Sequence, residues 1–227
     1  MSNGRLEGKR ILVTQASDFM GPATIELFRE QGAHVIADET DLRDLSAAGR
    51  VIEAAGELDV LVVNLAATAY PPKTADQTDD ETWAKMFDVM VHPLHRLVRA
   101  VLPGMYARQK GKIVVFGSAT GLKAYEGVSA YGAARSAQVG YVRTAGAEAA
   151  RHNVQINLIA QNWVENPEYY PPKVTEREAF KTLLGQQVPL GRLATAREDA
   201  LFALFLASDE SDFFVGQSIP FSGGWVQ

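Results

Sequence analysis

The sequence contains no cysteine and no excess of positive charge. Without cysteine the chain can form neither a disulfide framework nor a thiol nucleophile. Its net charge of −5 leaves no basic surface for nucleic acid or an anionic membrane. No apolar run reaches the roughly 18 residues that a membrane span needs, and no cationic start precedes an apolar signal core. We therefore expect a cytoplasmic protein that binds neither nucleic acid nor membranes.

The chain has the length of one domain. Its 227 residues, 47% of them apolar, can bury one sizeable core, and no internal repeat or low-complexity linker divides them. We expect no metal site, because the histidines do not combine with carboxylates at metal-ligand spacing. They are His34, His92, His95 and His152. The sequence predicts a single domain over residues 1–227.

Short apolar runs alternate with helical periods along the chain. Runs such as Arg10–Thr14 and Asp59–Val63 are apolar on both faces, which is typical of a parallel sheet covered on both sides. The expected strands are Arg10–Thr14, His34–Ala37, Asp59–Val63, Lys112–Phe116, Val154–Ile159 and Ser218–Phe221. The expected helices are Pro22–Gln31, Leu42–Ala55, Glu81–Arg108 with a bend near Pro93, Val128–Arg151, Thr175–Gln187 and Thr195–Ser208. This order predicts a doubly wound, Rossmann-like α/β sheet.

Three side chains in the middle of the chain suggest acid–base chemistry. Tyr131 and Arg135 are four residues apart, so on a helix they lie on one face. A permanent cation beside a phenol favours the phenolate. Ser118 stands at a strand end, where an open sheet presents its ligand site. Together they offer a base, its activator and a hydrogen-bond donor. Tyr131 and Arg135 alone would equally suit an exposed helix pair worth a few tenths of a kcal/mol.

The order of these motifs resembles that of the short-chain dehydrogenase/reductase superfamily. The resemblance covers essentially the whole chain: Thr14 after the first strand, Asn64 after the third, then Ser118, Tyr131 and a closing Gly223–Gly224. It implies a Rossmann-like fold with the site at the carboxyl ends of the strands.

The loop after the first strand departs from the superfamily pattern. Dehydrogenases of this superfamily carry Thr-Gly-x-x-x-Gly-x-Gly there, and the glycines let the backbone approach a pyrophosphate. The chain keeps only the last of these glycines in Thr14–Gly21. Gln15 and Phe19 add bulk, and Asp18 adds a negative charge. We therefore expect no nucleotide cofactor. Alternatively, Phe19 only packs the helix on the sheet.

Two further departures affect the proton relay of a dehydrogenase. Arg135 replaces the superfamily lysine, so it keeps the charge that acidifies the tyrosine but not the geometry that binds the nicotinamide ribose. Met90 replaces an asparagine of the preceding long helix. Asp38, where a dehydrogenase binds ribose hydroxyls, is then a relic or a helix cap.

Ser118, Tyr131 and Arg135 beside Phe19 resemble the halohydrin dehalogenases, a branch of this superfamily. The match is closest to the B-type members, in VHPLHR, GAEAARHNV and VPLGRLATAREDALFALFLASDESDF. The resemblance implies that vicinal halohydrins close to epoxides without a cofactor, releasing halide and a proton. It also implies the reverse opening of epoxides by halide, azide, cyanide or nitrite. Tyr131 would be the base, Arg135 would lower its pKa, and Ser118 would position the substrate oxygen.

By the same resemblance, a halide site lies between the first loop and the loop after Val154–Ile159. Backbone N–H groups and aromatic ring edges give an anion a weak site that it can leave. The expected residues are Phe19, Gln161, Asn162, Trp163, Val164 and, in preference to Tyr169, Tyr170. Alternatively, this is an ordinary substrate loop with exposed aromatic side chains.

The resemblance also implies a homotetramer, in which the helices Glu81–Arg108 and Val128–Arg151 pair between subunits. Two other functions stay open. One is a nicotinamide-dependent reductase with a degraded glycine motif, which would bind NADH. The other is a catalytically silent, ligand-binding member of the superfamily, which the intact Ser118, Tyr131 and Arg135 argue against.

Overall fold

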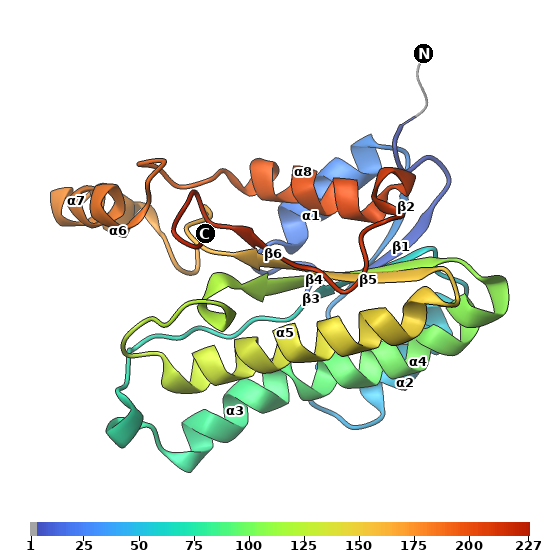
Figure 1. Ribbon diagram of the computed structural model, residues 1–227, viewed down its shortest axis with the longest axis horizontal. Coiled ribbons are helices and arrows are strands. Elements are labelled where there is room, and N and C mark those ends of the chain that lie inside the picture. Colours follow the sequence, from blue (N-terminus) through green and yellow to red (C-terminus); the bar gives the residue numbers. More distant parts are fainter. Residues whose placement is uncertain (1–3) are drawn as a thin grey trace.

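The computed structural model describes residues 4–227 and shows one parallel sheet between two layers of helices (Figure 1). The sheet has six strands in the order β2-β1-β3-β4-β5-β6. The strands are β1 Arg10–Thr14, β2 His34–Asp38, β3 Val60–Asn64, β4 Gly111–Ser118, β5 Val154–Gln161 and β6 Ser218–Phe221. The α-helices are α1 Gly21–Glu30, α2 Ala47–Ala55, α3 Asp80–Met90, α4 His92–Arg108, α5 Ser129–Ala150, α6 Pro172–Thr175, α7 Glu178–Gln187 and α8 Ala196–Ala207. The predicted doubly wound α/β fold is confirmed.

The central strands are buried on both faces. Every residue of β3 and β4 is buried, and alternate side chains enter different cores. Leu61 and Val63 belong to a core shared with α2, α4 and α5, whereas Val60 and Val62 belong to a core shared with α1 and α8. Figure 1 shows these two sets of helices on opposite sides of the sheet. This double burial explains why the strands are apolar throughout.

All six strands lie close to their predicted positions, and β1 and β6 have the predicted first and last residues. Strands β4 and β5 are longer than predicted, because pairing continues to Ser118 opposite Gln161. Ser118 is thus the last residue of a buried strand, and its side chain stands on a rigid element at the carboxyl end of the sheet.

Three helix predictions need correction. The helix expected over Leu42–Ala55 begins only at Ala47, because Asp44 Oδ1 accepts the Ser46 N–H at 2.7 Å and so holds the preceding residues in a turn. The stretch Glu81–Arg108 is two helices that meet at Val91, since Pro93 cannot donate a backbone hydrogen bond. The helix expected over Thr175–Gln187 begins only at Glu178, and Thr175 is the last residue of the short helix α6.

A buried carboxyl in α8 should make stability depend on pH. Asp199 is fully buried, and both of its oxygens lack a partner among the described residues. Burial raises its pKa to about 8. The unfolded chain loses this proton near pH 4, so between about pH 4 and 8 the folded state binds more protons and stability falls as pH rises.

Asp199→Asn removes the charge, so its advantage over the wild type should grow with pH. We expect the melting-temperature difference between variant and wild type to widen by roughly 5 °C or more between pH 5 and pH 8. Thermal scans at the two pH values measure this difference. An equal melting-temperature difference at pH 5 and pH 8 would contradict the raised pKa of Asp199.

Candidate active site

The loop between β1 and α1 keeps the backbone path of a glycine-rich turn with larger side chains on it. Gln15 and Phe19 have φ values of 43° and 48°, in the left-handed region that favours glycine. Gly21 is required, because a Cβ there would lie 2.3 Å from the Ala16 carbonyl oxygen. The chain thus retains the turn while two side chains occupy positions that glycine would leave open.

The side chain of Gln15 is bound to the residues that follow β3. Its Oε1 accepts the Ala66 N–H at 2.7 Å, and its Nε2 donates to the Ala66 carbonyl at 3.3 Å. From β3, Asn64 Nδ2 donates to the carbonyls of Gln15 and Asp18, both at 2.9 Å. The two strand ends are therefore joined directly through side chains.

Tyr169 adds a second connection across the same crevice. Its ring centroid lies 5.9 Å from that of Phe19, and its hydroxyl donates to the Ala67 carbonyl at 2.7 Å. In this fold a pyrophosphate would lie in the crevice at the carboxyl ends of β1 and β3. Side chains of Gln15, Phe19 and Tyr169 occupy or span that crevice, so these residues do not fit a dinucleotide.

The residues expected to act on a substrate proton lie together beside this crevice. Ser118 ends β4, Tyr131 is in the first turn of α5, and Arg135 follows one turn later. The guanidinium carbon of Arg135 lies 5.0 Å from the centroid of the Tyr131 ring. Arg135 is buried, and its Nη1 donates to the carbonyls of Leu65 at 3.0 Å and Phe116 at 3.2 Å. The cation is thus fixed by backbone groups of two strand ends.

Gln138 also holds this guanidinium, and the sequence analysis missed it. Its side chain is completely buried; Oε1 accepts a hydrogen bond from Arg135 Nη1 at 2.9 Å, and Nε2 donates to the Met90 carbonyl at 2.8 Å. Met90 is the last residue of α3, where the helix is interrupted. The only sequence signal is an amide three residues after Arg135, on the same helix face.

The surroundings of Tyr131 favour its phenolate form. Burial acts to raise the pKa of Tyr131, but the Arg135 charge, together with hydrogen bonding to Ser118 and Arg135, brings the pKa below its usual value. The Ser118 hydroxyl also lies 2.9 Å from Thr120 Oγ1, and its oxygen accepts the Thr120 N–H at 3.3 Å. The arrangement provides a base at lower pH than a free tyrosine would.

The expected halide-site residues lie along a row of aromatic rings. Phe19 lies beside Tyr169, and the ring centroids of Tyr169 and Tyr170 are 6.3 Å apart. Tyr170 stacks on Trp163 with a centroid distance of 6.0 Å. Both tyrosines thus belong to the row, although the sequence favoured Tyr170. Gln161 pairs with Ser118 in the sheet, whereas Val164 packs into the core beside α1 and α8.

The hydrogen-bond donors in this loop differ from the expected ones. The Asn162 N–H donates to the Phe221 carbonyl, and the Trp163 N–H donates to Asn162 Oδ1, both at 3.0 Å. These two backbone groups are therefore already used. Within residues 4–227, the buried indole Nε1 of Trp163 has no hydrogen-bond partner. That indole N–H is thus a buried donor without a partner in the described part of the chain.

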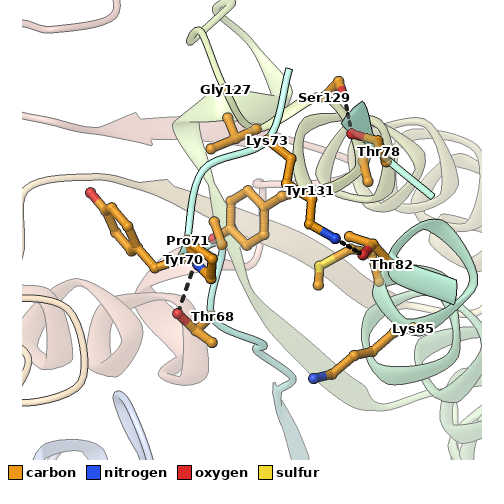
Figure 2. A pocket seen from close by; sticks show the side chains of 14 residues that line it. Thr68, Tyr70, Pro71, Lys73, Thr78, Thr82, Lys85, Gly127, Ser129 and Tyr131 are labelled. Atoms are coloured by element: carbon orange, nitrogen blue, oxygen red, sulfur yellow. Dashed lines mark hydrogen bonds between the residues drawn. The ribbon is translucent and has the colours of Figure 1, made fainter. Parts of the chain in front are cut away.

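A cavity of about 190 Å³ opens against the Tyr131 ring (Figure 2). Its walls come from the segment after β3, from α3 and from the start of α5. Among the described residues, no group of three histidine or acidic side chains is placed to hold a metal ion. No helix in residues 4–227 is long and apolar enough to cross a membrane.

Comparisons with known proteins show the family to which this chain belongs. Residues 5–226 match the family model described as Enoyl-(Acyl carrier protein) reductase. The 3-oxoacyl-[acyl-carrier-protein] reductase FabG of Thermotoga maritima is 30% identical over 252 aligned positions, which cover 98% of this chain and 99% of the relative. The 2-keto-3-deoxy-L-fuconate dehydrogenase of Xanthomonas campestris is also 30% identical, with 98% and 82% covered.

Solved structures of similar fold include dehalogenating proteins. One described as a dehalogenation enzyme has a TM-score of 0.90 and 30% identity, covering 97% of this chain and 99% of the other. Halohydrin dehalogenase HheC, bound to ethyl (2S)-oxiran-2-ylacetate, has a TM-score of 0.87 at 24% identity, with 94% and 96% covered. At 24% identity, the similarity to HheC shows only that the two folds are alike. The family match, the relatives and the single Rossmann-like domain show that this chain belongs to the short-chain dehydrogenase/reductase superfamily.

Proposed function

We propose that this protein is a halohydrin dehalogenase that needs no cofactor. It would convert vicinal halohydrins to epoxides and, in reverse, open epoxides with halide, azide, cyanide or nitrite. One observation carries the proposal: side chains of Gln15, Phe19 and Tyr169 occupy the dinucleotide crevice, while Ser118, Tyr131 and Arg135 stay together beside it. The dehalogenation enzyme of similar structure and 30% identity supports it.

The proposed reaction is an internal displacement without a change of oxidation state at the protein. The Tyr131 phenolate takes the proton of the substrate hydroxyl, whose oxygen then attacks the neighbouring carbon. The carbon–halogen bond breaks, and its electron pair leaves with the halide. Ser118 donates a hydrogen bond that holds the substrate oxygen, and Arg135 stabilises the phenolate. Because no hydride moves, a nicotinamide has no role.

The two directions should respond oppositely to pH. Ring closure needs the phenolate, so its rate rises with pH through the lowered pKa of Tyr131 and then levels. Ring opening needs the neutral phenol as the acid that protonates the epoxide oxygen, so its rate falls over the same range.

The departing halide would lie beside the indole of Trp163. The unpaired Nε1 donor suits an anion, and the rings of Tyr170 and Phe180 pack against the indole without adding a full charge. Such a site binds halide weakly enough for it to leave.

Trp163→Phe removes this donor and keeps an aromatic ring. Since a hydrogen bond to a charged group contributes about 1.5–3 kcal/mol, the inhibition constant for bromide should rise roughly tenfold or more. Halide-release assays at increasing bromide measure it, with Trp83→Phe on the exposed side of α3 as the matched control. Unchanged bromide inhibition in Trp163→Phe would remove the indole from the halide site.

The second candidate is a nicotinamide-dependent reductase. The curated relatives at 30% identity, a reductase and a dehydrogenase, favour it. The bonded Gln15 side chain and the Tyr169 bridge argue against it, because they stand where the pyrophosphate would bind.

A direct assay distinguishes the candidates. Protein free of nucleotide is mixed with a small chlorinated or brominated alcohol, and free halide and acid are followed together. A halohydrin dehalogenase releases them in equal amounts. Absence of halide, combined with oxidation of NADH or NADPH in the presence of a ketone, would support the reductase instead.

A further inference from the structure

We propose that the cavity beside Tyr131 selects halohydrins that carry a carboxylate, through Lys85. This inference rests on the proposed function and names the substrate class of that site. The cavity of about 190 Å³ has Tyr131 in its wall, so a group bound there lies next to the residue proposed as the base. Figure 2 shows the Tyr131 ring at the centre of the lining side chains.

The cavity has one uncompensated positive charge. Two lysines line it, and no aspartate or glutamate does. Lys73 is neutralised, because its Nζ lies 2.7 Å from Asp79 Oδ2 and 2.9 Å from Thr82 Oγ1. Lys85 forms no ion pair or side-chain hydrogen bond with any residue of 4–227. This lining favours an anionic group, because the Lys85 charge has no acidic partner in the cavity wall.

Lys85 is placed to meet a ligand in the cavity. It lies on α3 one turn after Thr82 and directly before the buried Met86, which anchors that part of the helix. Figure 2 shows its ammonium group pointing across the cavity toward Thr68. The ammonium can donate to a carboxylate in the cavity, and charge-assisted bonds of this kind are stronger than neutral ones.

The proposal places the substrate hydroxyl at Tyr131 and Ser118, the halogen toward Trp163, and a short chain that ends in a carboxylate at Lys85. 4-Chloro-3-hydroxybutanoate has this arrangement. Its hydroxyl proton goes to Tyr131, its oxygen forms the new C–O bond, and the C–Cl bond breaks to release chloride. The product is the epoxide carboxylate.

The test compares this acid with its ethyl ester, which has the same reacting atoms and no charge. In the wild type, kcat/KM should be higher for the acid, and added salt should reduce the difference because Lys85 is exposed. Lys85→Gln should lower kcat/KM for the acid roughly three- to tenfold, leave the ester unchanged and abolish the salt effect. Lys85→Arg should keep most of the preference, and Lys110→Gln, at the other end of the sheet, should keep all of it.

Each outcome decides between specific claims. Equal loss for acid and ester in Lys85→Gln, or no preference for the acid in the wild type, would overturn the carboxylate site and leave the dehalogenase assignment intact. If the wild type releases halide from neither compound but oxidises NADH with a ketone, the proposed function fails and the carboxylate site fails with it.

Discussion

Tyr131→Phe should reduce halide release by about a thousandfold or more while leaving the fold intact. Loss of a general base typically costs about 10²–10⁴ in rate, and phenylalanine cannot accept the substrate proton at all. The ring that packs under Arg135 stays, so only the oxygen is lost. The measurement is halide release from a chlorinated alcohol at saturating concentration, with circular dichroism and melting temperature as checks of folding.

The matched control is Tyr106→Phe, which removes a phenol oxygen from a residue of α4. The Tyr106 ring stacks on His152, away from the carboxyl ends of the strands. It should keep wild-type turnover. Substantial turnover by Tyr131→Phe would show that another group takes the proton, and the mechanism proposed here would be wrong.

Gln138→Met should raise the pKa of Tyr131 and move the pH profile of halide release to higher pH by about one unit, which is a roughly tenfold loss on the rising part of the profile. The glutamine accepts from Arg135 and donates to Met90, so methionine of similar size leaves the guanidinium without this anchor. The reasoning makes Gln138 a positioning residue that acts through Arg135. Gln138→Glu should shift the profile further, since a carboxylate would offset the Arg135 charge.

The pKa change can be measured without substrate. Phenolate absorbance is titrated for each variant, and the titration of Tyr131→Phe is subtracted. The pKa of Tyr131 is lowered whereas burial raises those of Tyr70, Tyr141 and Tyr170, so the low-pH signal belongs to Tyr131. Gln155→Met, which removes another buried glutamine, controls for lost stability. Equal Tyr131 titrations in Gln138→Met and wild type would contradict the role of Gln138.

The sheet could be predicted because burial on both faces determines the composition of its strands. The apolar runs of β1 and β3 show this, since every side chain of β3 and every side chain of β1 after Arg10 is buried. The start of α2 could not be read from helical periodicity, because the side chain of Asp44 competes with the helix for a backbone N–H. Hydrogen bonds of that kind depend on the local path of the chain.

The candidate site was predictable only as far as spacing along the chain determines it. Tyr131 and Arg135 lie on one helix face, so their proximity follows from the sequence. The loss of glycine at Gln15 was visible, but its pairing with Ala66 depends on how two strand ends meet. For the same reason the sequence did not reveal that Tyr169 spans the crevice.

Titration with NADH and NADPH tests the central claim most directly, because that claim is that side chains have taken the place of the redox nucleotide. Nucleotide fluorescence and the emission of the three tryptophans are followed as protein free of nucleotide is mixed with each dinucleotide. We predict no saturable change up to millimolar concentration, in the same preparation that releases halide from a chlorinated alcohol. Saturable binding at micromolar concentration would contradict the account.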